Sequence, residues 1–306
     1  MVRRTYTYVV FGVGILLVIA GALKLPGGIV AGGALCFLGL VLFGLSFIPR
    51  TEPAGEAPPP LSFFGRLTGI FFEPSEVFRN LRWHPHWLLA VLTTSLLAFA
   101  YTTAFTYRLT PERIVSFTND KLVEKGWIPV EQAERIKEQQ VEQAKSVPRV
   151  ALGVVTNFVG AFVLAAVFGA LYMLLVLLFG GRLGFWQALS VAAWAALPPL
   201  VIGRVISLAL LYVKDPEDIH PILGQGGLVT DNLGALVKPA EHPVFFAVLS
   251  AFGVLAFYHL WLTATGLRNA GERVSSGSAW TIAIIFWAIG LLFAVASSAL
   301  FGNFLS

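Results

Sequence analysis

Long apolar stretches, separated by short polar segments, are the main feature of this chain. A helix of about 20 apolar residues crosses the ~30 Å hydrocarbon core of a bilayer. Seven stretches approach or exceed that length and predict an all-α, polytopic transmembrane helical bundle of about seven spans. The predicted spans lie within Tyr8–Leu23, Ile29–Ile48, Trp87–Tyr107, Val150–Phe179, Leu183–Val213, Val244–Leu267 and Ala279–Phe301.

The first two spans are joined by Leu25-Pro26-Gly27-Gly28, a helix-breaking turn that predicts a transmembrane hairpin over residues 1–49. A cleaved signal peptide is the alternative, because two arginines precede a short apolar stretch that ends in Ala20-Gly21-Ala22. The proline-rich segment 50–62 then predicts an extended, solvated linker. The remaining residues, 63–306, form one predicted domain of five spans.

A short amphipathic helix is predicted where this domain begins, within a pair of interfacial helices at 63–83. Phe64, Leu67 and Phe71 recur at helical spacing, whereas the basic Arg66 falls beside them. An aromatic-rich amphipathic helix of this kind suits the membrane interface.

Two polar segments connect later spans. Residues 110–147 are the longest hydrophilic stretch, and Pro111 and Pro129 each suit the first turn of a helix. This stretch predicts a small helical extramembrane insert between the first two spans of the domain. Residues 214–242 contain five acidic residues together with several glycines and prolines, and they predict an irregular loop.

A few polar residues and prolines interrupt the apolar runs. Arg204 is a charge well inside the fifth span, and such a residue is either functional or reaches toward an interface along its flexible stem. Asn157 and His259 either line a cavity with it or hydrogen-bond between helices. The pair Pro198-Pro199 predicts a kink in the overlong fifth span.

Small residues recur every four positions in three spans and predict close helix packing, within one chain or in a homo-oligomer. They are Ala161, Ala165 and Gly169; Ala188, Ala192 and Ala196; and Gly290, Ala294 and Ser298.

Composition agrees with a membrane protein: 57% of residues are hydrophobic, 12% are charged and the mean hydropathy is +0.77. A soluble domain has about 25% charged residues. The net charge of +4 comes without a basic stripe interleaved with aromatics, so nucleic acid is not an expected partner. On the membrane side of the N-terminus the chain carries nine basic and five acidic residues. On the opposite side it carries eleven basic and twelve acidic residues. The positive-inside rule counts bases rather than net charge and weights those near span ends, and here the base count and the net charge point to opposite sides. The charges therefore give only a weak vote, and we favour a cytoplasmic N-terminus.

Motifs for catalysis are not found. The sequence has no HExxH, GxSxG or P-loop, so we expect neither an enzyme nor a bound cofactor. His84 and His86 with Glu73 and Glu76 resemble a metal-ligand set only loosely, and an interfacial corner is the better interpretation.

Three segments resemble the Yip1 family of membrane proteins. They are Ile70-Phe71-Phe72-Glu73-Pro74-Ser75-Glu76-Val77-Phe78, Ala193-Trp194-Ala195-Ala196-Leu197-Pro198-Pro199-Leu200, and His259-Leu260-Trp261-Leu262 followed by Gly266-Leu267. The likeness covers roughly Ser62 to Phe301 and implies a five-span domain with a cytoplasmic N-terminal side. It also implies a protein that works by interaction, with eukaryotic relatives tied to small-GTPase binding and vesicle traffic. The N-terminal hairpin lies outside the family pattern, and the long tail of eukaryotic members is missing, which suggests a bacterial inner-membrane protein.

The sequence thus predicts a non-enzymatic membrane scaffold or adaptor, with the lipid bilayer, a membrane protein or a second copy as its partners. The alternative is a small-solute transporter or channel that uses Arg204 and the Pro198-Pro199 kink, because broken helices and intramembrane charges mark many solute pathways.

Overall fold

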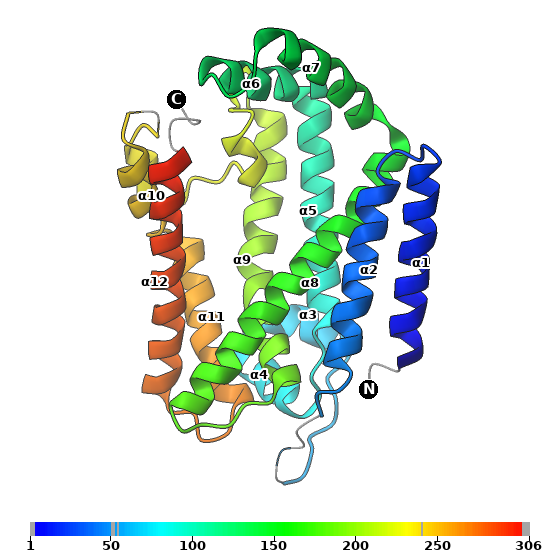
Figure 1. Cartoon of the computed structure of the whole chain (residues 1–306). Coiled ribbons are helices and arrows are strands. Elements are labelled where there is room, and N and C mark those ends of the chain that lie inside the picture. Colours follow the sequence, from blue (N-terminus) through cyan, green and yellow to red (C-terminus); the bar gives the residue numbers. More distant parts are fainter. Residues whose placement is uncertain (1–3, 50–52, 54, 240, 302–306) are drawn as a thin grey trace. The chain divides into compact units, whose positions relative to one another are not determined.

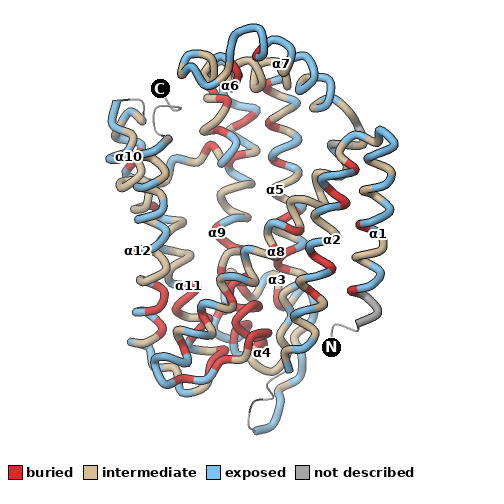
Figure 2. The backbone as a smooth tube through the Cα atoms, viewed as in Figure 1, coloured by how far each residue is buried: buried red, intermediate tan, exposed pale blue. Residues whose placement is uncertain are grey.

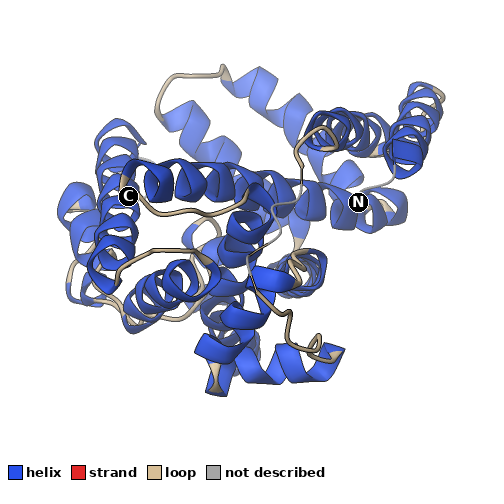
Figure 3. Cartoon of the chain, turned by 90° about the horizontal axis from the view of Figure 1, so that it is seen from below, coloured by secondary structure: helices blue, strands red, loops and turns tan. Residues whose placement is uncertain are grey.

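The structure is a computed structural model that describes residues 4–49, 53, 55–239 and 241–301. The described residues form α-helices and three short 3₁₀ turns but no strand (Figures 1 and 3). The helices are α1 (Arg4–Ala22), α2 (Gly28–Leu45), α3 (Phe63–Phe72), α4 (Pro74–Trp83), α5 (Leu88–Leu109), α6 (Pro111–Glu124), α7 (Val130–Lys145), α8 (Val147–Leu178), α9 (Phe185–Val213), α10 (Pro243–Ser250), α11 (Val254–Ala270) and α12 (Ser276–Phe301).

Five of these helices are long and apolar enough to cross a membrane: α2, α5, α8, α9 and α12. Many of their large apolar side chains are exposed, such as Leu292 and Phe293 of α12 at 68% and 75%. Lipid is the solvent that such surfaces need. The predicted all-α membrane bundle is confirmed. Two predicted spans correspond to shorter helices, since the apolar part of α1 covers Thr7–Ala22 and α11 has 17 residues.

The sixth predicted span is not one helix, and that part of the prediction is wrong. The chain breaks between α10 and α11, where Gly253 is extended with φ −118° and ψ 156°. The amide of Leu255 donates to Asp231 Oδ2 at 2.7 Å, and Asn232 forms an isolated antiparallel bridge with Gly253. The preceding loop therefore supplies the partners that the interrupted helix lacks.

The chain divides into two compact units. The first consists of Met1–Phe47, Ser95–Gly160 and Gly203–Val229, and the second of Ile48–Thr94, Ala161–Ile202 and Thr230–Ser306. Helices α5, α8 and α9 each contribute residues to both units.

In the first unit α1 and α2 pack against each other, and glycines allow the two helices to approach closely. A Cβ atom at Gly21 would lie 2.3 Å from the Ile29 backbone nitrogen, and one at Gly32 would lie 2.5 Å from that of Val18. No side chain fits at such distances, so backbone packs directly against backbone. Small residues serve the same purpose in membrane helix pairs generally.

The predicted helical insert is also confirmed, as α6 and α7. Pro111 occupies the first turn of α6, where its missing N–H costs nothing. An ion pair between Lys145 at the end of α7 and Glu112 at the start of α6 joins the two helices. This pair lowers the pKa of Glu112.

Much of the apolar side of α3 and α4 is buried in the second unit. Ile70, Val77, Phe78 and Leu81 of α3 and α4 are each at most 1% exposed, and Figure 2 shows buried residues gathered in this region. Ser62 caps α3 by accepting from the Gly65 amide, and Pro74 begins α4. The predicted pair of short helices therefore forms, with its apolar side turned into the unit.

The predicted linker at 50–62 lies partly outside the described residues, because 50–52 and 54 are not described. Its described part is mostly exposed, yet it is attached to α4. Asn80 donates to the Pro59 carbonyl and accepts from the Leu61 amide, and the His84 ring lies 2.8 Å from the Pro58 carbonyl. These contacts hold the chain just before α3.

Candidate functional site

Arg204 lies in the part of α9 that belongs to the first unit, and the loop after α9 turns back beside it (Figure 1). Its guanidinium carbon is 4.7 Å from the centre of the Tyr101 ring, a cation–π distance. Its Nη1 donates to the Gln225 carbonyl at 3.4 Å. Among the described residues no carboxylate is within ion-pair distance of Arg204, so an aromatic ring and a backbone carbonyl surround the charge.

Two further side chains hold the same stretch of loop. The Tyr101 hydroxyl donates to the Gly224 carbonyl at 2.5 Å, and the Ser207 hydroxyl accepts from the Leu228 amide at 2.9 Å. Tyr101 is eight residues before the end of α5, about 12 Å along the helix axis. Irregular backbone at such a depth is tolerated only where protein or water satisfies its polar groups. Here α5 and α9 provide those partners.

An apolar cluster surrounds these polar contacts. Tyr101, Phe105 and Leu109 of α5 pack with Leu211 of α9 and with loop residues, and the cluster is almost fully buried. The two loop residues in it are Ile219 and Leu228. The loop is therefore a packed part of the first unit, although the sequence predicts only an irregular connection.

Arg113 of the insert holds the outer part of the loop. Its guanidinium donates to the carbonyls of Pro216, Glu217 and Ile219, the last two at 3.2 and 3.3 Å. His220 follows, with its ring 5.0 Å from that of Phe117 and its Nδ1 accepting from two loop amides at 3.2 Å. Burial and the charge of Lys121 lower the pKa of His220 below its ordinary value of 6.5. The neutral ring is thus the form that fits the loop.

The structure does not assemble the other predicted site residues around Arg204. Asn157 donates to the Gly153 carbonyl of its own helix at 3.0 Å. Pro198 and Pro199 lie within α9, which continues through them, and they are buried in the second unit. His259 is half-buried in α11 and also belongs to the second unit.

The predicted membrane-interface residues fall on different sides of α3. Phe64 is 73% exposed, whereas Leu67 and Phe71 are half-buried. Arg66 is only 9% exposed, and its Nε has no hydrogen-bond partner in the described part of the chain. The exposed aromatic edge of α3 consists of Phe63, Phe64 and Phe72.

The residues weighed as metal ligands serve other contacts. His84 contacts the linker, and the carbonyl of His86 accepts from Trp194 Nε1 at 2.5 Å. The hydrogen bond and negative charge of Glu76 raise the pKa of Glu73. No group of three or more metal-ligating side chains occurs among the described residues.

Sequence reasoning missed several residues that the structure makes important. Arg82 and Glu272 form an ion pair at 2.7 Å, and the Glu272 backbone pairs with that of Arg182. Asp231 caps α11 from a loop. Each contact joins residues distant in sequence, and no local pattern indicates such pairs. Asp231 lies 24 positions before Leu255, not directly before the helix as a cap signature requires.

Comparison with known proteins decides the family. A family model described as the Yip1 domain matches residues 68–297. The chain belongs to the Yip1 family. No curated protein and no solved structure matches it.

The residues that match the Yip1 domain cover most of the fold. The Yip1 domain begins within α3 and ends within α12, so it includes the Arg204 cluster, the insert and the broken α10–α11 helix. Hairpin α1–α2 precedes it. With its apolar helices, this Yip1 family member is a multi-pass membrane protein whose environment is the lipid bilayer.

Proposed function

We propose that this Yip1 family protein is a non-enzymatic scaffold or adaptor of the bacterial inner membrane, with a cytoplasmic N-terminus, that recruits a membrane-protein partner. The observation that carries the proposal is the exposed aromatic edge of α3. Phe63, Phe64 and Phe72 are 53%, 73% and 84% exposed, on a helix whose opposite side is buried.

A rigid support makes this edge suitable for recognition. Ile70, on the other side of α3, is fully buried, and α4 continues the same core through Val77 and Phe78. The linker is held on α4 by Asn80. Aromatic side chains on a preorganised surface supply large contact area at low entropic cost, and they are enriched where proteins bind one another.

Crosslinking in native membranes, followed by affinity purification of the full chain, tests the proposal. The variant replaces Phe63, Phe64 and Phe72 by Ser; its matched control replaces the same residues by Leu and keeps the edge apolar. We expect a distinct protein to be enriched with the natural chain and the Leu variant, and lost with the Ser variant. Recovery of the same proteins with all three would contradict the proposal.

A small-solute transporter or channel is the second candidate, and the break between α10 and α11 favours it. Discontinuous membrane helices commonly form solute and ion sites in transporters. Asp231 places a carboxylate at this break. Arg204 and the kink predicted at Pro198-Pro199 add to it, although Arg204 is engaged with Tyr101 and the loop. Saturable flux in proteoliposomes that is lost in Asp231→Asn would support this candidate over the scaffold.

A further inference from the structure

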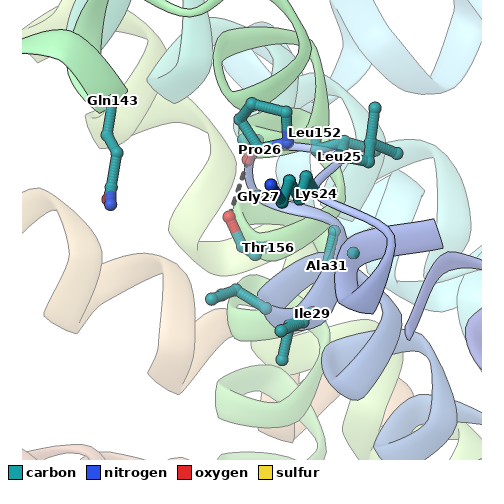
Figure 4. Close-up of a pocket in the computed structure, with 12 residues that line it drawn as sticks. Lys24, Leu25, Pro26, Gly27, Ile29, Ala31, Gln143, Leu152 and Thr156 are labelled. Atoms are coloured by element: carbon teal, nitrogen blue, oxygen red, sulfur yellow. Dashed lines mark hydrogen bonds between the residues drawn. The ribbon is translucent and has the colours of Figure 1, made fainter. Parts of the chain in front are cut away.

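A cavity of about 550 Å³ lies in the first unit at the turn of the α1–α2 hairpin. Its wall comes from the hairpin, from α7 through Gln143 and from α8 through Leu152 and Thr156, as Figure 4 shows. Ligand sites in proteins commonly have volumes of about 300 to 1,000 Å³. The cavity is therefore large enough for part of a lipid.

Among the described residues that line this cavity, Lys24 is the one charged residue and none is a carboxylate. Lys24 has a positive φ of 76°, a backbone conformation that is uncommon for a residue with a side chain. The hairpin turn fixes it there, because the Lys24 amide donates to the Gly21 carbonyl and the Leu25 amide to that of Ala20. The turn thus fixes the Lys24 backbone at the edge of the cavity, and a lysine side chain there, without an acidic neighbour among the described lining residues, favours an anion.

The start of α2 adds to this preference. Gly27, the residue before the helix, provides no side-chain cap. Ile29 and Val30 of the first turn line the cavity. First-turn amide groups carry partial positive charge and need partners from outside the helix.

The rest of the wall is mainly apolar. Ile29, Val30 and Leu152 present aliphatic side chains, and Thr156 and Gln143 add polar groups. Both α2 and α8 are long enough to span a membrane, and the hairpin turn directly precedes α2, at the level expected for lipid headgroups. The cavity thus combines a cation with an apolar surface at the level of the membrane interface.

We propose that this cavity binds an anionic phospholipid. The phosphate lies at Lys24 and the first turn of α2, and the start of an acyl chain lies against Ile29, Val30 and Leu152. The site belongs partly to the hairpin, which precedes the Yip1 domain. The proposal does not depend on the scaffold function.

Native mass spectrometry of the full-length protein, equilibrated with equal amounts of phosphatidylglycerol and phosphatidylcholine, tests the proposal. The natural chain retains phosphatidylglycerol in preference. Lys24→Glu lowers that retention at least about fivefold, because it replaces attraction by repulsion of the phosphate. Val30→Trp lowers it by filling the cavity, and Val30 is 67% exposed, so the larger side chain has room.

The matched control is Lys238→Glu, which makes the same charge change at a lysine paired with Glu241 in a loop of the second unit. Its retention should equal that of the natural chain, and all variants should unfold at similar temperatures in detergent. Equal retention of both lipids by the natural chain, or undiminished phosphatidylglycerol in Val30→Trp and Lys24→Glu, would overturn the proposal. So would equal losses in Lys238→Glu and Lys24→Glu. Displacement of the lipid by millimolar inorganic phosphate would show a phosphate site instead.

Discussion

The loop after α9 and the break between α10 and α11 both place irregular backbone beside membrane helices, but they satisfy it with a different balance of partners. In the loop, Tyr101, Arg113 and Arg204 donate to backbone carbonyls, and Ser207 accepts from one amide. At the break, a loop carboxylate, Asp231, accepts from the amide of a helix start. The comparison shows that the unpaired backbone group determines which side chain serves it. Carbonyl groups need a donor, and amide groups need an acceptor.

The largest expected effect is at Arg113, which serves three loop carbonyls. Arg113→Ala should lower the free energy of unfolding by about 2 to 3 kcal/mol, because charged donors make the stronger hydrogen bonds. Thermal unfolding in detergent measures it. Arg135→Ala, at an exposed residue of α7, is the control and should leave the transition unchanged. Equal transitions for both variants would show that the outer loop does not need this donor.

Asp231 tests the other side of the comparison. Asp231→Ala removes the acceptor for the Leu255 amide and should cost about 1 to 2 kcal/mol, a typical loss for a helix cap. Asp231→Asn keeps an oxygen in place and should retain most of the stability in the same unfolding measurement. If Asn is as damaging as Ala, the negative charge matters more than the acceptor, and the solute-transport candidate gains support.

A smaller change concerns Tyr101. Tyr101→Phe deletes one hydroxyl and leaves the Gly224 carbonyl without its donor, for an expected loss of about 1 kcal/mol. Tyr107→Phe in the same helix is the matched control, since Tyr107 is 85% exposed. A loss of equal size in both variants, measured by chemical denaturation in detergent, would argue against a specific role for the Tyr101 hydroxyl.

The smallest effect depends on pH and involves His220. Its folded-state pKa is lowered, so the folded loop favours the neutral ring. Protonation then becomes easier in the unfolded state, and stability should decline as pH falls below about 6.5, the ordinary histidine value. Hydrogen exchange of the loop at pH 7.5 and 5.5 checks this. In His220→Asn, which offers an oxygen acceptor but does not titrate, the pH dependence should disappear; its persistence would assign the effect to another group.

The helical part of the fold follows largely from the sequence. Apolar length predicts the spans, and Leu25-Pro26-Gly27-Gly28 predicts the hairpin turn between α1 and α2. Pro111 and Pro74 mark helix starts that the structure contains. These features depend on local helix propensity and on burial in lipid, and both can be inferred from short stretches of sequence.

Long-range hydrogen bonds explain what the sequence could not predict. The apolar run around Val248 and Leu255 looks continuous, yet the acceptor from Asp231 makes the break at Gly253 possible. Arg204 is visible as a charge in a span, but its Tyr101 partner is identified only when α5 and α9 are brought together. The membrane-interface role of Phe64, Leu67, Phe71 and Arg66 and the domain boundaries remain predictions.

Arg204 anchors the loop that returns beside α9. Hydrogen exchange of the full chain in detergent, compared between the natural protein and Arg204→Leu, tests it most directly. In Arg204→Leu we expect faster exchange in residues 222–228, including the Leu228 amide, and unchanged exchange in α10 and α11. Unaltered exchange in 222–228 would contradict the claim and leave the charge of Arg204 free for another role.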